Sequence, residues 1–243
     1  FYGFNLKREG PLRNKKVRQA LARSVDKVRI TKYVSRAGET PAYSTVPPGL
    51  PGYTPAPMAS YDPEAARKLL ADAGYPDGKG FPTLEILYNS REDHKSIATA
   101  IQEMWRQELK IDVVLRNVEW KIVLDMQRDL EFDITRRSWY GDYNDPNTFI
   151  DMFTTTNGNN NTAFSNAEYD RLVAAAAREP APEKRMKMLA KHLRGLMKMM
   201  AKLMGARSVS EVSQKVPEEL TPYLTQAYNN FDRFVQTGQL PLY

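Results

Sequence analysis

Apolar residues recur along this chain with two periods, one typical of strands and one typical of helices. Alternating or short apolar runs predict strands over residues 1–6, 83–88, 112–116 and 132–139. Spacings of three and four residues predict helices over residues 15–33, 93–109, 120–128 and 169–177. Trp105 lies on the apolar side of the second helix, which predicts a place in the core. Strands that alternate with helices indicate an α/β fold in which helices pack on a sheet.

Local start and stop signals add one further helix. Asp62 is suited to its N-cap, Pro63 to its first position and Gly74 to its end. Asp26 is a candidate cap for a second helical turn earlier in the chain. Residues 41–62 are too rich in proline for a central strand, so they predict an ordered loop or a linker.

Length and composition narrow the class of protein. With 243 residues the chain can form one large or two modest domains around a substantial core. The net charge of +6 permits an anionic partner, but basic residues are scattered among 29 acidic ones, as on a solvated surface. The absence of cysteine excludes disulfides and thiol chemistry, and no apolar run is long enough to span a membrane. The chain begins in a strand-like segment without a secretion signal, so we expect a piece of a longer chain.

The richest local chemistry lies at the end of the last predicted strand. Arg136, Trp139 and Asp142 place a cation, a flat aromatic ring and a carboxylate within seven residues. An aspartate can take an ammonium group and an arginine a carboxylate, while a strand edge offers backbone N–H and C=O groups. This combination suits a short peptide better than a metal, a nucleotide or a sugar. The alternative role for Asp142 is to cap the turn into Asn144-Asp145-Pro146.

Several short motifs also occur in the order found in a known family. They are Val17–Leu21, Pro41–Tyr43, Asp62–Leu70, Ala73–Tyr75, Trp139–Phe153, Asn157–Thr162 and Phe164–Asp170. Over residues 1–190 the chain resembles the extracellular solute-binding proteins of the oligopeptide-binding type, which deliver peptides to ABC transporters. The resemblance implies a periplasmic or extracellular location, with an oligopeptide and a membrane permease as partners.

The same resemblance implies one α/β lobe of a periplasmic-binding-protein-like fold, with a mixed sheet flanked by helices and a second lobe missing. The match stops after about residue 190. Residues 191–243 are rich in methionine and lysine at first and predict helices where the family would supply strands. We expect this helical C-terminal extension to pack on the lobe, although such a helix can also lie on an anionic membrane or in a partner's groove.

The family's ligand contacts carry over to several positions. By resemblance, Asp142 pairs with the peptide's ammonium and Arg136 with its carboxylate. His94 matches a position that contacts longer peptides, although a lone histidine at a helix start is often an ordinary polar residue. Where the family has a basic residue on the helix after Trp120, this chain has Gln127. Arg128 is one step away and is a further candidate contact for the peptide's carboxylate.

Backbone and aromatic groups complete the expected site. An extended peptide can pair with the backbone of Ser138, Trp139, Tyr140 and Gly141 whatever its sequence, and the glycine lets a ligand come close. Trp139 is a candidate pocket wall, as is Trp120, for which a place in the core is an equal alternative. Arg137 alternates with its neighbour and should point to the opposite face of the strand.

The leading hypothesis is therefore a peptide-binding lobe that is weak or inactive alone. The alternative is a scaffold or interaction module that self-associates and has no small-molecule ligand. An enzyme is not expected, because the sequence lacks the GxSxG, HExxH and Walker-type motifs. No cofactor, metal or nucleic acid is expected either. The spacing of Asp133, Asp142, Asp145 and His94 fits no metal-ligand set, and basic and aromatic residues do not interleave as in RNA-binding proteins.

Overall fold

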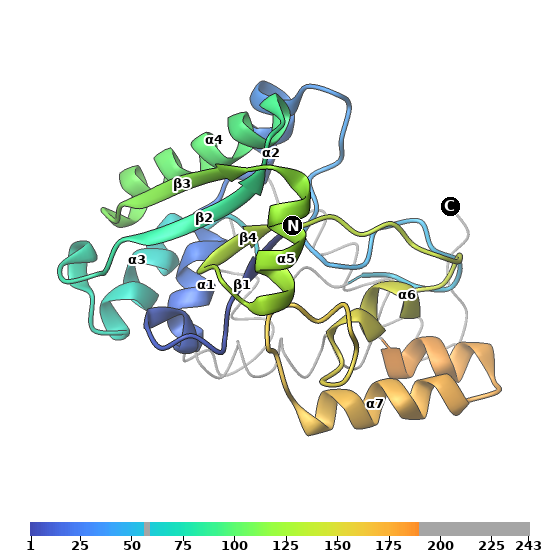
Figure 1. The fold of residues 1–243 in the computed structure, drawn as a ribbon. Helices are drawn as coiled ribbons and strands as arrows, with labels where there is room; N and C mark the ends of the chain where they lie inside the picture. Colours follow the sequence, from blue (N-terminus) through green and yellow to red (C-terminus); the bar gives the residue numbers. More distant parts are fainter. Residues whose placement is uncertain (56–58, 190–243) are drawn as a thin grey trace. The chain divides into compact units, whose positions relative to one another are not determined.

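The computed structural model describes residues 1–55 and 59–189, which belong to one compact unit spanning Phe1–Leu193 (Figure 1). The strands are β1 (Tyr2–Phe4), β2 (Leu84–Asn89), β3 (Val113–Val118) and β4 (Ile134–Arg136). The α-helices are α1 (Lys15–Arg23), α2 (Lys27–Arg29), α3 (Pro63–Asp72), α4 (Glu92–Leu109), α5 (Trp120–Asp129), α6 (Asn147–Ile150) and α7 (Ala167–Arg178), followed by a helical segment at 182–189. The helices expected over 191–243 lie outside the described residues.

The sheet is mixed, with the strand order β1-β4-β2-β3. β4, β2 and β3 run parallel, while β1 is antiparallel to β4 and pairs Tyr2 with Arg136. A mixed sheet flanked by helices confirms the predicted fold class. The parallel strands end at Asn89, Val118 and Arg136, so the segments that follow them emerge at one edge of the sheet.

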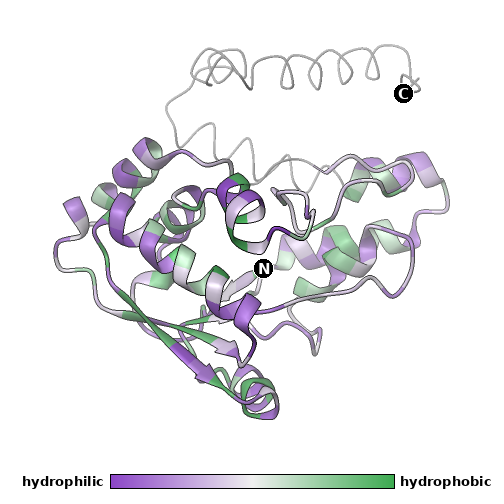
Figure 2. Ribbon diagram, turned by 90° about the horizontal axis from the view of Figure 1, so that it is seen from above, coloured by the Kyte–Doolittle hydropathy of each residue, from purple (hydrophilic) through white to green (hydrophobic). Residues whose placement is uncertain are grey.

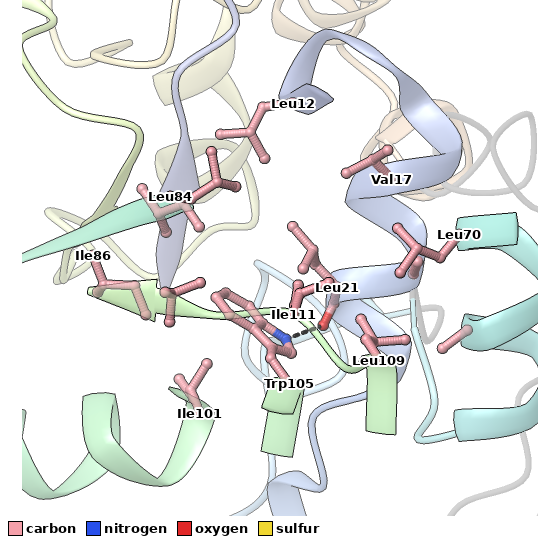
Figure 3. Close-up of a cluster of buried hydrophobic side chains, with 14 of the residues drawn as sticks. Leu12, Val17, Leu21, Leu70, Leu84, Ile86, Ile101, Trp105, Leu109 and Ile111 are labelled. Carbon is pink, nitrogen blue, oxygen red and sulfur yellow. Dashed lines mark hydrogen bonds between the residues drawn. The ribbon is translucent and has the colours of Figure 1, made fainter. Parts of the chain in front are cut away.

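Helices cover both faces of the sheet (Figure 1). On one face the indole Nε1 of Trp105 donates a hydrogen bond of 2.9 Å to the Leu21 carbonyl, deep in the largest apolar cluster (Figure 3). This cluster joins α1, α3, α4 and the sheet through Leu12, Val17, Ala20, Leu21, Ala66, Leu70, Leu84, Ile86, Tyr88, Ala98, Ile101, Trp105, Leu109, Ile111, Val113 and Ile134. On the other face, α5 packs on the sheet through Leu87, Val123, Met126 and Phe132. In Figure 2 the helices carry both apolar and polar stretches, as amphipathic helices do.

A third apolar cluster gathers α6, α7 and the proline-rich loop. Its buried members are Val46, Tyr53, Ile150, Tyr169, Val173, Ala176 and Leu189. Because Val46 and Tyr53 are 2% and 6% exposed, the described part of the proline-rich stretch is an ordered loop rather than a linker.

The capping predictions agree with the structure. The Asp62 side chain accepts a hydrogen bond of 2.9 Å from the Ala65 amide at the start of α3. Gly74 follows that helix with φ of 98°, a conformation that favours glycine. The Asp26 side chain likewise accepts a hydrogen bond of 2.9 Å from the Arg29 amide and begins a second helical turn after α1.

The prediction of a strand over residues 132–139 was wrong at its end, because β4 stops at Arg136. Beyond that point the Trp139 indole donates to the Thr148 carbonyl, so the chain turns toward α6 instead of following the sheet. β1 is also shorter than expected. Its neighbour Asn5 turns its side chain inward and donates to the carbonyl groups of Leu130 and Phe132, at 2.8 Å each.

We predict that Trp105→Ala lowers the free energy of unfolding by about 3–5 kcal/mol, because it opens a cavity and removes the hydrogen bond to Leu21. Chemical denaturation measures this change. Val114→Ala on the edge strand β3 is the control, since Val114 is 50% exposed and should cost little. Equal losses for the two variants would contradict the assignment of this cluster as the core.

Candidate functional site

The candidate residues meet at the carboxyl edge of the parallel strands. His94 lies in the first turn of α4 after β2, Trp120 begins α5 after β3, and residues 137–146 follow β4. In open α/β sheets, ligands bind outside this edge, because loops from several strands converge there. The sheet topology therefore brings together residues that are far apart in the sequence.

Thr148 organises the turn that carries Asp142. This threonine is 1% exposed, and its carbonyl accepts a hydrogen bond of 2.7 Å from the Trp139 indole. The Thr148 hydroxyl accepts a hydrogen bond of 3.1 Å from the Asp142 amide, and it lies 3.5 Å from the Asp142 Oδ2 atom. The sequence reasoning missed Thr148, since these bonds depend on how the turn folds back on α6.

Gly141 is closely packed in this turn. A Cβ atom there would lie 3.0 Å from the Phe149 ring and 3.1 Å from the Thr148 methyl group. The expected reason for this glycine was the approach of a ligand backbone. The structure adds a second reason, because the side chains of Phe149 and Thr148 would have to shift by a few tenths of an ångström to admit a Cβ atom here.

The Asp142 carboxylate is exposed, and it forms no ion pair within the described residues. The capping role that could have explained it belongs to a neighbour: Asp145 Oδ1 accepts 2.8 Å from the Asn147 amide. Burial raises the pKa of Asp151, and the negative charge of Asp142 raises it further. Asp142 thus presents a negative charge to solvent at the sheet edge.

Arg136 forms a second pole of opposite charge. Its side chain is half-buried, shares a sheet face with its register partner Tyr2, and forms no ion pair with any described residue. Burial lowers the pKa of this guanidinium. The backbone is held in place by the buried Gln127, whose amide donates 3.1 Å to the Arg136 carbonyl and 2.8 Å to the Thr135 hydroxyl. Gln127 therefore holds the strand end that carries the arginine.

His94 lies near this pole. Its ring is 5% exposed, and its Nδ1 atom has no hydrogen-bond partner among the described residues. Burial lowers the pKa of His94, and the charge of Arg136 lowers it further, so the ring is neutral at pH 7. The Tyr2 hydroxyl and the side-chain amide oxygen of Asn89 are also buried without a partner in the described part of the chain.

The remaining candidates differ in position. Trp120 is 47% exposed, which excludes the core alternative, and Tyr140 is 86% exposed. Arg128 is exposed, and its guanidinium forms surface ion pairs with Asp125 at 2.7 Å and with Asp129 at 3.4 Å.

Arg137 has a structural contact. Its guanidinium donates a hydrogen bond of 2.8 Å to the Asn159 carbonyl and lies over the Phe1 ring. Arg137 therefore connects the end of β4 to the asparagine-rich loop at Asn157–Thr162.

An open depression of about 570 Å³ lies elsewhere, where β2 and β4 begin. Its charged groups largely satisfy one another, since Arg8 pairs with Asp133 at 2.9 Å and Arg116 with Glu85 at 3.4 Å. In residues 1–55 and 59–189, no three acidic or histidine side chains gather in a way that could hold a metal ion. No helix in the same residues is long and apolar enough to cross a membrane. The carboxyl edge, with its unpaired charges, is therefore the stronger candidate for a ligand site.

Unpaired charges of both signs at the carboxyl edge of the strands lie where open α/β folds bind their ligands. Residues 1–161 match the family model of the bacterial extracellular solute-binding proteins, family 5 (middle region). The chain belongs to this family, which confirms the resemblance. The family is one of solute-binding proteins and not of enzymes, as expected.

Individual relatives agree with this assignment. The chain is 39% identical over 185 residues to the periplasmic murein peptide-binding protein MppA of Escherichia coli, covering 74% of this chain and 34% of that protein. It is 34% identical over 199 residues to the oligopeptide-binding protein OppA of Bacillus subtilis, covering 79% and 36%. The crystal structure of Haemophilus influenzae OppA with the peptide RPPGFSPFR has a TM-score of 0.73 at 35% identity, covering 80% of this chain and 39% of that one. The chain thus spans about a third of the length of its curated relatives.

We predict that Thr148→Val lowers the free energy of unfolding by about 0.5–1.5 kcal/mol, because it leaves the Asp142 amide without its acceptor. Denaturation measures the loss, and hydrogen exchange of the Asp142 amide should become faster. Thr155→Val is the control, since that threonine is exposed. Unchanged exchange at Asp142 would contradict the role assigned to Thr148.

We also predict that the His94 ring titrates below the ordinary histidine value of about 6.5. The neutral ring is favoured in the folded state, so its contribution to stability is present above the ordinary value. That contribution declines as the pH falls from there to the lowered folded value. An NMR titration of the His192→Gln variant, which leaves a single histidine, measures the midpoint. A midpoint at or above the ordinary value would show that the ring is not desolvated.

Proposed function

We propose that this chain is the peptide-contacting lobe of a solute-binding protein that captures extended oligopeptides. In the proposed complex, Asp142 pairs with the peptide's ammonium group, and Arg136 with His94 receives its carboxylate. Ser138–Gly141 pairs with the peptide backbone, while Trp139 and Trp120 line side-chain pockets. The observation that carries this proposal is the exposed, unpaired carboxylate of Asp142 at the carboxyl edge of the sheet.

The ammonium pole is supported by the way Asp142 is held. Its amide is bound by Thr148, so the backbone is fixed while the carboxylate stays in solvent. A primary ammonium offers three N–H donors, and a carboxylate accepts such charge-assisted bonds more strongly than neutral ones. The nearby Asp151 carboxyl group interacts with the charge of Asp142 and adds to the negative potential of this pole.

The carboxylate pole is supported by Arg136 and the polar groups beside it. A half-buried guanidinium with no internal carboxylate is costly unless a ligand supplies the missing anion. The neutral His94 ring can donate one hydrogen bond to that anion. Arg128 has no part in this proposal, since Asp125 and Asp129 hold it.

Backbone recognition is supported by the segment between the two poles. Within the described chain, the N–H and C=O groups of Ser138, Trp139, Tyr140 and Gly141 form no hydrogen bond. The Trp139 side chain is anchored by Thr148, so this open stretch of backbone is fixed at one point. A peptide laid beside it could form main-chain hydrogen bonds that do not depend on sequence.

The whole protein's activity is part of the same proposal. In it, the longer protein operates in the periplasm or outside the cell, a second lobe closes over the peptide, and a membrane permease receives it. The chain alone keeps only one wall of such a cleft, so water screens both poles. Exposed ion pairs contribute about 0.2–1 kcal/mol each, so we expect only weak peptide binding from this chain.

We predict that Asp142→Asn weakens the binding of a free tripeptide by roughly 1.5- to 5-fold, the loss of one exposed ion pair. An NMR titration with tri- to pentapeptides, followed at the amides of residues 138–142, measures affinities in the millimolar range. The control is Asp112→Asn, an exposed carboxylate that lies just before β3 at the other end of the parallel strands. Equal binding by both variants, or micromolar binding by the unmodified chain, would refute this half-site.

A further inference from the structure

The helical segment at 182–189 contacts the turn that carries the ammonium pole. Arg185 on this segment makes two contacts with Asp145: its Nη2 atom donates 2.9 Å to Oδ1, and its Nη1 atom contacts Oδ2. Each side chain is only 20% exposed. A two-point contact between a guanidinium and a carboxylate fixes orientation as well as distance. The helix is therefore locked to this turn by a largely buried ion pair.

The contact reaches Asp142 through one short helix. The same Oδ1 atom of Asp145 that accepts from Arg185 also accepts 2.8 Å from the Asn147 amide, at the start of α6. The next residue is Thr148, whose hydroxyl accepts from the Asp142 amide. A helix of four residues has little stability of its own, so its position depends on such contacts. A chain of contacts thus leads from Arg185 through Asp145 and Thr148 to Asp142.

In the pair of Asp145 and Arg185, each charged group stabilises the ionised form of the other. Burial alone would raise the pKa of Asp145, but the hydrogen bonds from Arg185 and from the Asn147 amide outweigh it and hold the pKa below its usual range. The hydrogen bond to Asp145 in turn raises the pKa of Arg185. Both groups are ionised at neutral pH. Removal of either partner would leave the other partly buried without its counter-charge.

Apolar contacts hold the same helix against α6. Leu189 and Met186 belong to the cluster that includes Ile150 and Phe149. The Phe149 ring is also the group that a side chain at Gly141 would strike. Packing and charge therefore converge on the turn from two sides.

We infer that Arg185 is a positioning residue for the ammonium pole: through Asp145 and Thr148 it sets the place at which Asp142 is presented. This inference rests on the proposed function, because it concerns the same peptide site. Residues 182–189 precede the region where the resemblance ends, so the inference also makes the last described helix a part of the site's support.

The test compares a peptide with a free amino terminus and the same peptide with that terminus acetylated. Trialanine and N-acetyl-trialanine are titrated into the unmodified chain, Arg185→Gln and Asp145→Asn, with Asp142 and Gly141 amide shifts as the readout. In the unmodified chain the free peptide should bind about 1.5- to 5-fold more tightly, the contribution of an exposed ion pair. In both variants this ratio should fall toward one, because Asp142 is no longer held in place. Arg185→Lys, which keeps the charge but loses the two-point contact, should give an intermediate ratio.

Arg171→Gln is the matched control. Arg171 pairs with Glu168 on the surface of α7, with both side chains more than 60% exposed, so the ratio should not change. A general loss of stability would weaken the binding of both peptides equally and leave the ratio of their affinities unchanged. An unchanged ratio in the Arg185 and Asp145 variants would overturn the inference. A ratio of one in the unmodified chain would instead refute the proposed function itself.

Hydrogen exchange gives a second measurement that needs no ligand. If Arg185 holds the turn, exchange of the Asp142 amide should be faster in Arg185→Gln than in Arg171→Gln under conditions where both are folded. Should Arg185→Gln fail to fold, Arg185→Lys takes its place in the same comparison. Equal exchange at Asp142 would show that the ion pair does not position the turn.

Discussion

The short strand β4 is the constraint on which the rest of the lobe depends. It is only three residues long, yet it pairs with β1 on one side and β2 on the other. Ile134 is paired with Phe4 and with Ile86, and it is fully buried in the main cluster. Thr135 beside it is also fully buried, with its hydroxyl bonded to Gln127. Two ladders and two helical layers therefore meet on one strand, and the direction in which it ends fixes where the following residues emerge.

The chemistry of the edge follows from that arrangement. Groups within the sheet must find internal partners, because an unpaired polar group is costly in an apolar interior. Groups just beyond the strand ends are partly hydrated and can keep an unpaired charge at low cost. Asp142 occupies such a position, whereas Asp145, a few residues further on, is paired with Arg185. Two aspartates in one turn thus have different roles because their surroundings differ.

Much of the fold could be predicted from local sequence. The helix from Pro63 carries its own signals in Asp62 and Gly74, and these depend only on neighbouring residues. The burial of Trp105 followed from helical spacing alone. The end of β4 could not be read in this way, because the apolar and polar pattern continues past Arg136 while a tertiary contact redirects the chain.

The site was accessible to prediction only in part. Asp142 and Arg136 stood out because charged residues near an aromatic ring are visible in sequence. Thr148 and Arg185 did not, since their contacts cross six and forty residues respectively. The sequence also left undecided whether Trp120 is buried or exposed, because a tryptophan at the start of an amphipathic helix can face the core or the solvent.

A lobe of this kind has a physical reason to bind weakly by itself. Water around an exposed carboxylate competes with the ammonium of a peptide, and the high dielectric reduces their attraction. A second protein surface that closed over the same peptide would exclude this water, and the attraction would increase without any new residue in this lobe. Under the proposed function, the unpaired charges at the sheet edge would gain most of their effect on such closure.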